Sequence, residues 1–295
     1  MATLTDRALL SALRLLPRNL VSRGAGHAAS IPWPRPLRPY LWRAFGRAVG
    51  VDFNEVRDPL ASFPSLQDFF VRHLKDGARP VDGAADALVS PCDGAWGQAG
   101  SVEKGQVLQV KGRPYSLAEL LGSAEEAEAF EGGRFATLYL SPKDYHRFHT
   151  PCRATLARVR YLPGGLWPVN RAGVELVDSL FARNERICAF FDVDEPGYTG
   201  RFCLVAVGAT MVGKIRLSFD SMESNLGGRR RRQERSYGGG ELTFERCAEW
   251  GRFHFGSTLV LVATPGTLAL DVEPRGTVLR LGRRIGSLGR GASAG

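Results

Sequence analysis

The sequence RICAFFDVDEPGYTGRFCLVAVGA at residues 186–209 decides the fold class. It contains two runs rich in β-branched, aromatic and small apolar residues, joined by a segment with one proline and two glycines. Such runs on either side of a turn predict neighbouring antiparallel strands. Similar runs recur from about residue 88 onward: QVLQV (106–110), FATLYL (135–140), ATLARVRYL (154–162), GKIRLSF (213–219), ELTFERC (241–247) and STLVLVA (257–263). Their density predicts a largely antiparallel β core.

The first 87 residues have helical periodicity instead. Helices are predicted at residues 5–16, where three leucines share one face, from Pro17 toward Ala29, around residues 41–49, and at residues 65–75 after a Ser65 cap. A proline-rich break at residues 31–39 separates the second helix from the third. Two short helical insertions, residues 116–122 and 174–184, interrupt the β region. We therefore expect an α+β protein with an N-terminal helical region, residues 1–87, and a catalytic β core, residues 88–295.

Charge is concentrated at the N-terminus. The whole chain has a formal net charge of +9. Residues 1–50 hold eight arginines against one acidic residue, Asp6, which gives them a net charge of +7. Such a segment favours an anionic membrane surface or a nucleic acid. Zinc-finger spacing, an aromatic RNA-binding signature and a basic-region helix are all missing from the sequence, so no nucleic-acid partner is predicted.

Cysteine usage and hydropathy indicate the cellular compartment of the protein and whether it spans a membrane. The five cysteines are dispersed and form no CxxC motif, which predicts a reducing compartment without structural disulfides. No stretch reaches the ~18 apolar residues of a membrane-spanning helix. The Gly/Arg-rich stretch within residues 223–240 is predicted to be a solvated charged loop.

The segment EWGRFHFGSTLVLV, residues 249–262, carries the candidate chemistry. A strand-like run reaches Gly256-Ser257-Thr258, and an apolar β run continues from there. A serine hydroxyl can attack the preceding carbonyl and convert the amide to an ester, and glycine at that position tolerates strained backbone angles. β-Elimination would then leave dehydroalanine, which hydrolyses to a pyruvoyl group. The simpler interpretation is a bend capped by a hydroxyl.

Self-cleavage of this kind needs a base for the serine and a group that orients the base. The segment SPKDYHRFHTP (141–151) supplies His146 and His149, two of only five histidines. Their HxxH spacing could suggest a metal, but no third ligand is clustered with them, so no metal is predicted. The segment SPCDG (90–94) supplies Asp93, which by itself is more typical of a turn.

Seven segments resemble, in the same order, those of the phosphatidylserine decarboxylase family. An ordered set is far more specific than any single motif, and the similarity covers most of the chain from about residue 55. The segments are FFVRHLKDGARPVD (69–82), SPCDG (90–94), SPKDYHRFHTP (141–151), PGGLWPVN (163–170), LFARNER (180–186), VGATMVGKI (207–215) and AEWGRFHFGST (248–258).

The resemblance implies a proenzyme that cuts itself between Gly256 and Ser257. The products would be a β chain, residues 1–256, and a short α chain, residues 257–295, and a homo-oligomer of such pairs is expected. Ser257 would become the pyruvoyl cofactor, which forms a Schiff base with the substrate. The expected reaction converts phosphatidylserine to phosphatidylethanolamine and carbon dioxide in phospholipid biosynthesis.

The resemblance also implies the roles of the other site residues. Asp93, His149 and Ser257 would form the relay for self-cleavage, and His146 would act as an acid or base on the substrate side. The chain departs from the family pattern by having Phe255 where leucine is frequent, Trp250 where methionine is usual and Trp167 where phenylalanine is usual. All three remain bulky and apolar, so the departures concern substrate geometry more than the reaction.

The sequence is also compatible with other functions. A serine hydrolase could use Ser257, His149 and Asp93, although no G-x-S-x-G elbow surrounds the serine. Pyruvoyl chemistry on a soluble amino acid and a non-enzymatic membrane-binding β domain are further alternatives. The basic N-terminus favours a lipid substrate and a peripheral position on the cytoplasmic face of a bacterial cell membrane, with the mitochondrial inner membrane as the alternative.

Overall fold

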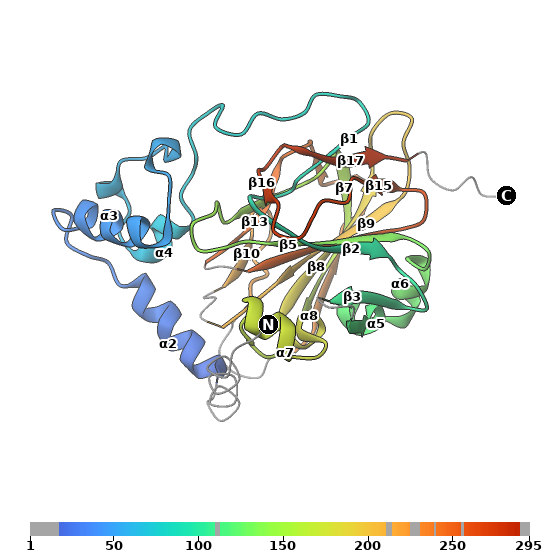
Figure 1. Cartoon of the computed structure of the whole chain (residues 1–295), viewed down its shortest axis with the longest axis horizontal. Coiled ribbons are helices and arrows are strands. Elements are labelled where there is room, and N and C mark those ends of the chain that lie inside the picture. Colours follow the sequence, from blue (N-terminus) through green and yellow to red (C-terminus); the bar gives the residue numbers. More distant parts are fainter. Residues whose placement is uncertain are drawn as a thin grey trace.

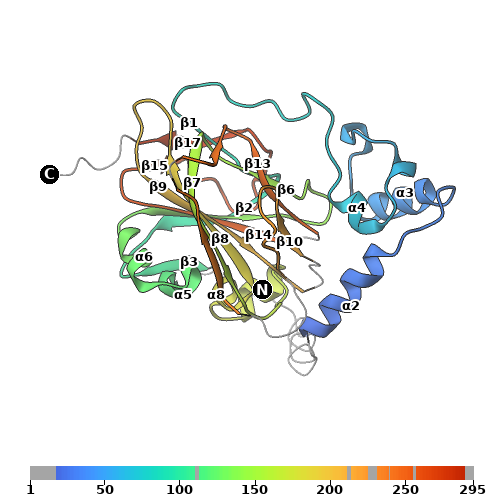
Figure 2. The same cartoon turned by 180° about the vertical axis from the view of Figure 1, so that it is seen from behind.

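The chain folds as N-terminal helices at one side of a large β core (Figures 1 and 2). The computed structural model describes residues 18–109, 113–210, 214–224, 231–238, 240–254 and 257–289. The helix predicted at residues 5–16 lies outside these ranges. Antiparallel strands dominate the described residues and helices are fewer and mostly short, so the predicted α+β class is confirmed.

The N-terminal helices agree with the sequence in position but not always in length. The second and third predicted helices are α2 (Arg18–Ser30) and α3 (Arg38–Val49). Two short 3-10 turns follow, η1 (Phe53–Glu55) and η2 (Leu60–Ser62). A small core of its own holds this region together, built from Trp42, Val51, Val56, Phe63 and Phe69.

The fourth helix, α4 (Leu66–Phe70), is shorter than predicted. A capping box between Ser65 and Asp68 begins it as expected. It ends early because the chain after it bridges to the segment around Glu55, where Lys75 N donates to Glu55 O at 2.9 Å and Leu74 forms a β-bridge with Val56. Tertiary pairing thus overrides the helical pattern of residues 71–75.

A nine-stranded antiparallel sheet forms the centre of the β core. Its strands follow the order β11, β7, β8, β9, β14, β5, β2, β16, and β12 also pairs with β7. The bounds are β2 (Gly94–Ser101), β5 (Arg134–Tyr139), β7 (Ala154–Leu162), β8 (Arg186–Val193), β9 (Arg201–Val207), β11 (Gln233–Ser236), β12 (Thr243–Phe244), β14 (Thr258–Ala263) and β16 (Val278–Leu279). Strand β14 is buried along its whole length between β9 and β5.

Alternate residues of the large sheet feed two separate cores. Leu259 and Leu261 belong to one, which small sheets cover, and Val260 and Val262 belong to the other, which helices cover. The small sheets consist of β6 (Arg147–His149), β10 (Ile215–Leu217) and β13 (Glu249–Phe253), and of β1 (Ala87–Val89), β15 (Leu268–Leu270) and β17 (Arg284–Leu288). A hairpin of β3 (Gln106–Gln109) and β4 (Arg113–Ser116) stands apart from them.

The helices on the second face are α5 (Leu117–Leu121), α6 (Ala124–Ala129), α7 (Arg171–Leu176) and α8 (Leu180–Arg183). Helix α5 was predicted, whereas α6 was not. The single helix predicted at residues 174–184 is wrong, because α7 and α8 are separated by a break. The buried Gln109 side chain explains why the break is tolerated, since its amide donates to Val174 O and Val177 O and accepts from Leu180 N.

The prediction of a charged loop within residues 223–240 also needs correction. Residues Gln233–Ser236 form strand β11 at the edge of the large sheet, paired with β7. All four residues are exposed, so the segment has no hydrophobic alternation that the sequence could reveal. An ion pair stabilises this edge strand, because Glu234 accepts a hydrogen bond from Arg160 Nε on β7 at 2.7 Å.

Candidate active site

Ser257 lies at the centre of the large sheet, immediately before β14. The residue is fully buried. Its carbonyl accepts a hydrogen bond from Leu140 N at 2.9 Å, and its hydroxyl contacts the carbonyl of Val207. The two neighbouring strands, β5 and β9, therefore hold this residue from both sides. Gly256, the other half of the predicted cleavage site, lies outside the described residues.

The two-histidine motif lies beside the segment that leads to Ser257. Strand β6, which contains His149, pairs antiparallel with β13, and His146 O accepts from Phe253 N at 2.9 Å. Gly251 permits this close approach, because a side chain there would meet the Phe148 ring at 2.4 Å. The structure therefore brings both histidines next to the strand that ends just before the predicted cleavage site.

Both imidazoles are buried and neutral near pH 7. Burial lowers the pKa of His149 to about 4 and that of His146 to about 3. His149 Nδ1 and His146 Nε2 have no hydrogen-bond partner within the described ranges. His146 Nδ1 lies 2.8 Å from Asp144 O, and a carbonyl can only accept, so Nδ1 carries the proton and Nε2 has a free lone pair. Each histidine can thus act as a base.

Helix α4 covers this site from the N-terminal side. Phe70 packs on His146 with the ring centroids 4.3 Å apart, and Val71 O accepts from Arg147 Nε at 2.9 Å. Gln67 Nε2 lies 2.6 Å from Nδ1 of His254, a third buried histidine. His254 was not among the site residues predicted from the sequence, although it lies two residues before Gly256 in the quoted motif. The N-terminal helices are therefore part of the site's wall.

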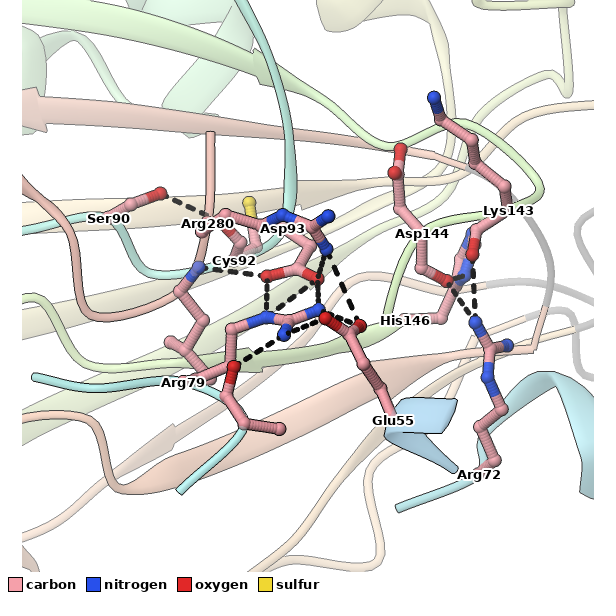
Figure 3. Close-up of polar contacts among 12 residues, drawn as sticks. Glu55, Arg72, Arg79, Ser90, Cys92, Asp93, Lys143, Asp144, His146 and Arg280 are labelled. Atoms are coloured by element: carbon pink, nitrogen blue, oxygen red, sulfur yellow. Dashed lines mark hydrogen bonds and ion pairs between the residues drawn. The ribbon is translucent and has the colours of Figure 1, made fainter. Parts of the chain in front are cut away.

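Asp93 is held by an arginine (Figure 3). It lies at a bend before β2, and its carboxylate accepts from Arg79 Nε at 2.8 Å, from Arg79 Nη2 at 2.5 Å and from Leu281 N at 2.8 Å. The same guanidinium binds Glu55 through two hydrogen bonds of 2.9 and 2.7 Å, and this contact lowers the pKa of Glu55. The side chain of Asp93 is 2% exposed, so this is a buried ionic bridge.

The predicted relay residues are not hydrogen-bonded to one another in the described part of the chain. His149 N donates to Pro91 O at 2.7 Å, which places the bend containing Asp93 against β6. Among the residues that the structure describes, no hydrogen bond joins Asp93 to His149, or His149 to Ser257. Arg79 and Glu55 are the partners that sequence reasoning missed, although Arg79 lies in one of the seven quoted segments.

A cavity adjoins strand β14 on the face of the large sheet that the helices cover. It has a volume of about 200 Å³ and a mostly apolar lining that includes Tyr139, Val174, Phe181 and Thr258. The hydroxyls of Thr137 and Thr258 are buried at this cavity without a hydrogen-bond partner in the described part of the chain. Across the described ranges, no group of three potential metal ligands is found.

Comparisons with known proteins agree with this arrangement. The family model described as phosphatidylserine decarboxylase matches residues 66–287. A phosphatidylserine decarboxylase proenzyme of Myxococcus xanthus is 38% identical over 96% of this chain and 99% of its own length. One from Anaeromyxobacter is 41% identical over the same shares of the two chains, and one from Brevibacillus brevis is 38% identical over 92% of this chain and 94% of its own. The chain therefore belongs to the phosphatidylserine decarboxylase family.

Proposed function

We propose that the protein cuts itself before Ser257 and then decarboxylates phosphatidylserine. The observation that carries this proposal is Ser257 itself, buried immediately before β14 and directly after glycine. The neutral histidines His146 and His149 lie just before and in β6, which pairs with β13, the strand that ends shortly before the cleavage site. Its relatives are named phosphatidylserine decarboxylase proenzymes, a name that implies processing of a precursor. The products of processing would be residues 1–256 and 257–295.

Processing requires only groups of this chain and water. The Ser257 hydroxyl attacks the carbonyl carbon of Gly256, and the amide bond gives way to an ester. Loss of the Cα proton of Ser257 then expels the Gly256 carboxylate and leaves dehydroalanine, to which water adds as ammonia departs. A pyruvoyl group remains at the start of β14. The hydrogen bond from Leu140 N to Ser257 O, and the pairing of the following strand β14 with β5 and β9, would keep residue 257 in place throughout.

We assign His149 as the base that takes the Ser257 proton. A pKa of about 4 keeps its imidazole neutral and able to accept at pH 7. Asp93 is assigned to orient His149. For that role its carboxylate has to turn from Arg79 toward the imidazole, across the bend that already contacts His149 through Pro91 O.

In the processed enzyme, the pyruvoyl group would supply an electrophilic carbonyl that withdraws electrons from the substrate's amine-bearing carbon. Residue 257 fits this group because it is fully buried and contacts Leu140 and Val207 on either side. We assign His146 to the substrate side, where its bare Nε2 can accept a proton and return it. Phe70 excludes water from this imidazole and preserves its neutral form.

The test is to measure mass and turnover together. Under denaturing conditions, purified protein should separate into two chains with the masses of residues 1–256 and 257–295, and the smaller should resist N-terminal sequencing because a pyruvoyl group has no amine. Vesicles containing phosphatidylserine should release carbon dioxide. His146→Ala should still yield two chains but turn over slowly. An intact chain with full activity would refute the pyruvoyl assignment, and normal turnover by His146→Ala would refute that residue's role.

We further propose peripheral attachment to an anionic bilayer through the N-terminal region, on the cytoplasmic face of the membrane. No helix among the described residues is long and apolar enough to cross a bilayer. The link between α2 and α3 instead exposes large apolar side chains, among them Trp33 (43% exposed) and Leu37 (47%). No acidic residue occurs between Arg7 and Val51, so the surrounding charge is basic.

Changing Trp33 and Leu37 together to serine should weaken binding to anionic vesicles about thirty-fold, because partial burial of each is worth about 1 kcal/mol. Their backbone contacts, such as Trp33 N to Pro64 O, would remain, so self-cleavage should be unchanged. Val272→Ser is the matched control, since Val272 is 70% exposed on the β core. Co-sedimentation at low and high salt measures the effect. Equal losses for the control and the double variant would contradict docking through this link.

A further inference from the structure

Arg72 is a buried cation without an anionic partner. The residue is 4% exposed and directly follows the covering helix α4. Only its Nη2 makes hydrogen bonds to described residues, at 2.8 Å to Lys143 O and 3.3 Å to Asp144 O, and its Nε is buried without a partner. Arg186, also buried, satisfies its three nitrogens with four carbonyls. Arg72 is therefore under-satisfied by comparison.

The acidic groups near Arg72 are already engaged elsewhere. Asp144 turns its carboxylate away and accepts from the backbone and hydroxyl of Ser141, each at 2.7 Å. Asp93 and Glu55 are bound by Arg79. Burial lowers the pKa of Arg72 to about 10 in spite of these neighbours. These carboxylates therefore offset only part of the effect of burying this guanidinium.

A small polar cavity adjoins the guanidinium. It has a volume of about 90 Å³. Its lining combines four basic and four acidic residues: Arg72, Arg79, Lys143, Arg280, Asp52, Glu55, Asp93 and Asp144. Lys143 is exposed at its edge and makes no ion pair with any residue that the structure describes. Arg72 and Lys143 thus line this cavity without a direct ion pair to a described residue, and the unpartnered Nε of Arg72 is a donor that a bound anion would complete.

The cavity lies next to the substrate-side histidine. Arg72 Nη2 and His146 Nδ1 both bind the carbonyl oxygen of Asp144, at 3.3 and 2.8 Å (Figure 3). Both side chains are therefore within a few ångströms of one atom. The guanidinium lies over the ring of Phe69 in helix α4, the helix whose Phe70 packs on His146.

We propose that Arg72, with Lys143 at the rim, binds the phosphodiester of the phospholipid headgroup. This inference rests on the proposed function and names the group that recognises its substrate. The headgroup carries two anions, a phosphodiester and a carboxylate. A cation fixed on the carboxylate would stabilise the charge that decarboxylation removes, and so would oppose the reaction. The phosphodiester keeps its charge throughout, so binding it assists the substrate and the transition state equally.

The experiment compares Arg72→Gln and Arg72→Lys with Arg57→Gln, which removes an exposed arginine of the same region. Two soluble probes separate the anions: glycerophosphoethanolamine has the phosphodiester only, and N-acetylserine has the carboxylate only. Each probe is titrated into the processed protein, and binding is measured by ligand NMR. Arg72→Gln should bind glycerophosphoethanolamine roughly tenfold or more weakly than wild type. Arg72→Lys should be intermediate, and Arg57→Gln and all N-acetylserine titrations unchanged. KM for phosphatidylserine should rise with little change in kcat.

Several outcomes would overturn this assignment. One is equal binding of glycerophosphoethanolamine by wild type and Arg72→Gln, and another is a loss confined to N-acetylserine, which would assign Arg72 to the carboxylate. If Arg72→Gln does not fold, Arg72→Lys decides, because a single ammonium should bind the diester measurably more weakly than the guanidinium fork. Wild-type protein that binds the diester probe but releases no carbon dioxide would refute the decarboxylase proposal and leave the anion site standing.

Discussion

A Ser257→Ala precursor should remain a single chain of 295 residues and release no carbon dioxide from phosphatidylserine. The substitution removes both the nucleophile for self-cleavage and the atoms from which the pyruvoyl group would form. Loss of a nucleophile of this kind costs about 10⁴-fold or more in rate. Folding should survive, because the hydroxyl contributes about one hydrogen bond, to Val207 O, worth about 1 kcal/mol.

Thr258→Val is the matched control for this variant. It removes a hydroxyl one residue away and keeps the side chain's shape, and that hydroxyl has no hydrogen-bond partner in the described ranges. The control should split into two chains at the wild-type rate. Intact mass and thermal unfolding measure the two variants side by side. A Ser257→Ala protein that still splits at this position would show that another group attacks the Gly256 carbonyl.

Asp93→Asn and Arg79→Gln should separate the relay from the ionic bridge. Either change breaks a buried ion pair and should lower the free energy of unfolding by about 3–5 kcal/mol. Only Asp93→Asn also removes the group assigned to orient His149, so only it should slow cleavage, by up to about 10⁴-fold as in other relays. Arg79→Gln should cleave at a near-normal rate in the fraction that folds. His149→Ala should be as slow as Asp93→Asn.

The double variant Asp93→Asn/Arg79→Gln completes the comparison. The double variant should recover part of the lost free energy of unfolding, because it leaves no unpaired charge at the Arg79–Asp93 contact. Its cleavage should stay slow. Urea unfolding gives the stability, and the time course of mass change in freshly made precursor gives the cleavage rate. Normal cleavage by Asp93→Asn would mean that Asp93 serves the ionic bridge alone. Equal slowing by Arg79→Gln would mean that the bridge, and not the relay, controls the reaction.

Periodicity in the sequence predicted the elements of this fold that are long and locally consistent. Helices α2 and α3 are of this kind, and the central strands β8, β9 and β14 were predicted from continuous apolar runs bounded by turns. The break between α7 and α8 could not be predicted in this way. It depends on the side chain of Gln109, which is more than sixty residues away in the chain.

The candidate site was likewise predicted only in part. The ordered motifs led to Asp93, His146, His149 and Ser257, whose roles remain predictions. They did not indicate that Arg79 binds the Asp93 carboxylate. That contact joins two irregular segments, which have neither a helical nor a strand pattern in the sequence. A buried arginine such as Arg72 likewise has no signature in the sequence, since only the folded chain shows that no carboxylate reaches it.

The pairing of the last strands has a consequence for reversibility. Strands β14, β16 and β17 pair with β5 and β9, with β2 and with β1, all of which precede residue 256. If the chain is cut before Ser257, strands of the two fragments remain paired in the same sheets. Refolding after full denaturation then becomes an association of two molecules, one of them a short peptide, and so depends on protein concentration. Such a protein can be assembled efficiently only once, as a precursor, and its working lifetime is set by how slowly it first unfolds.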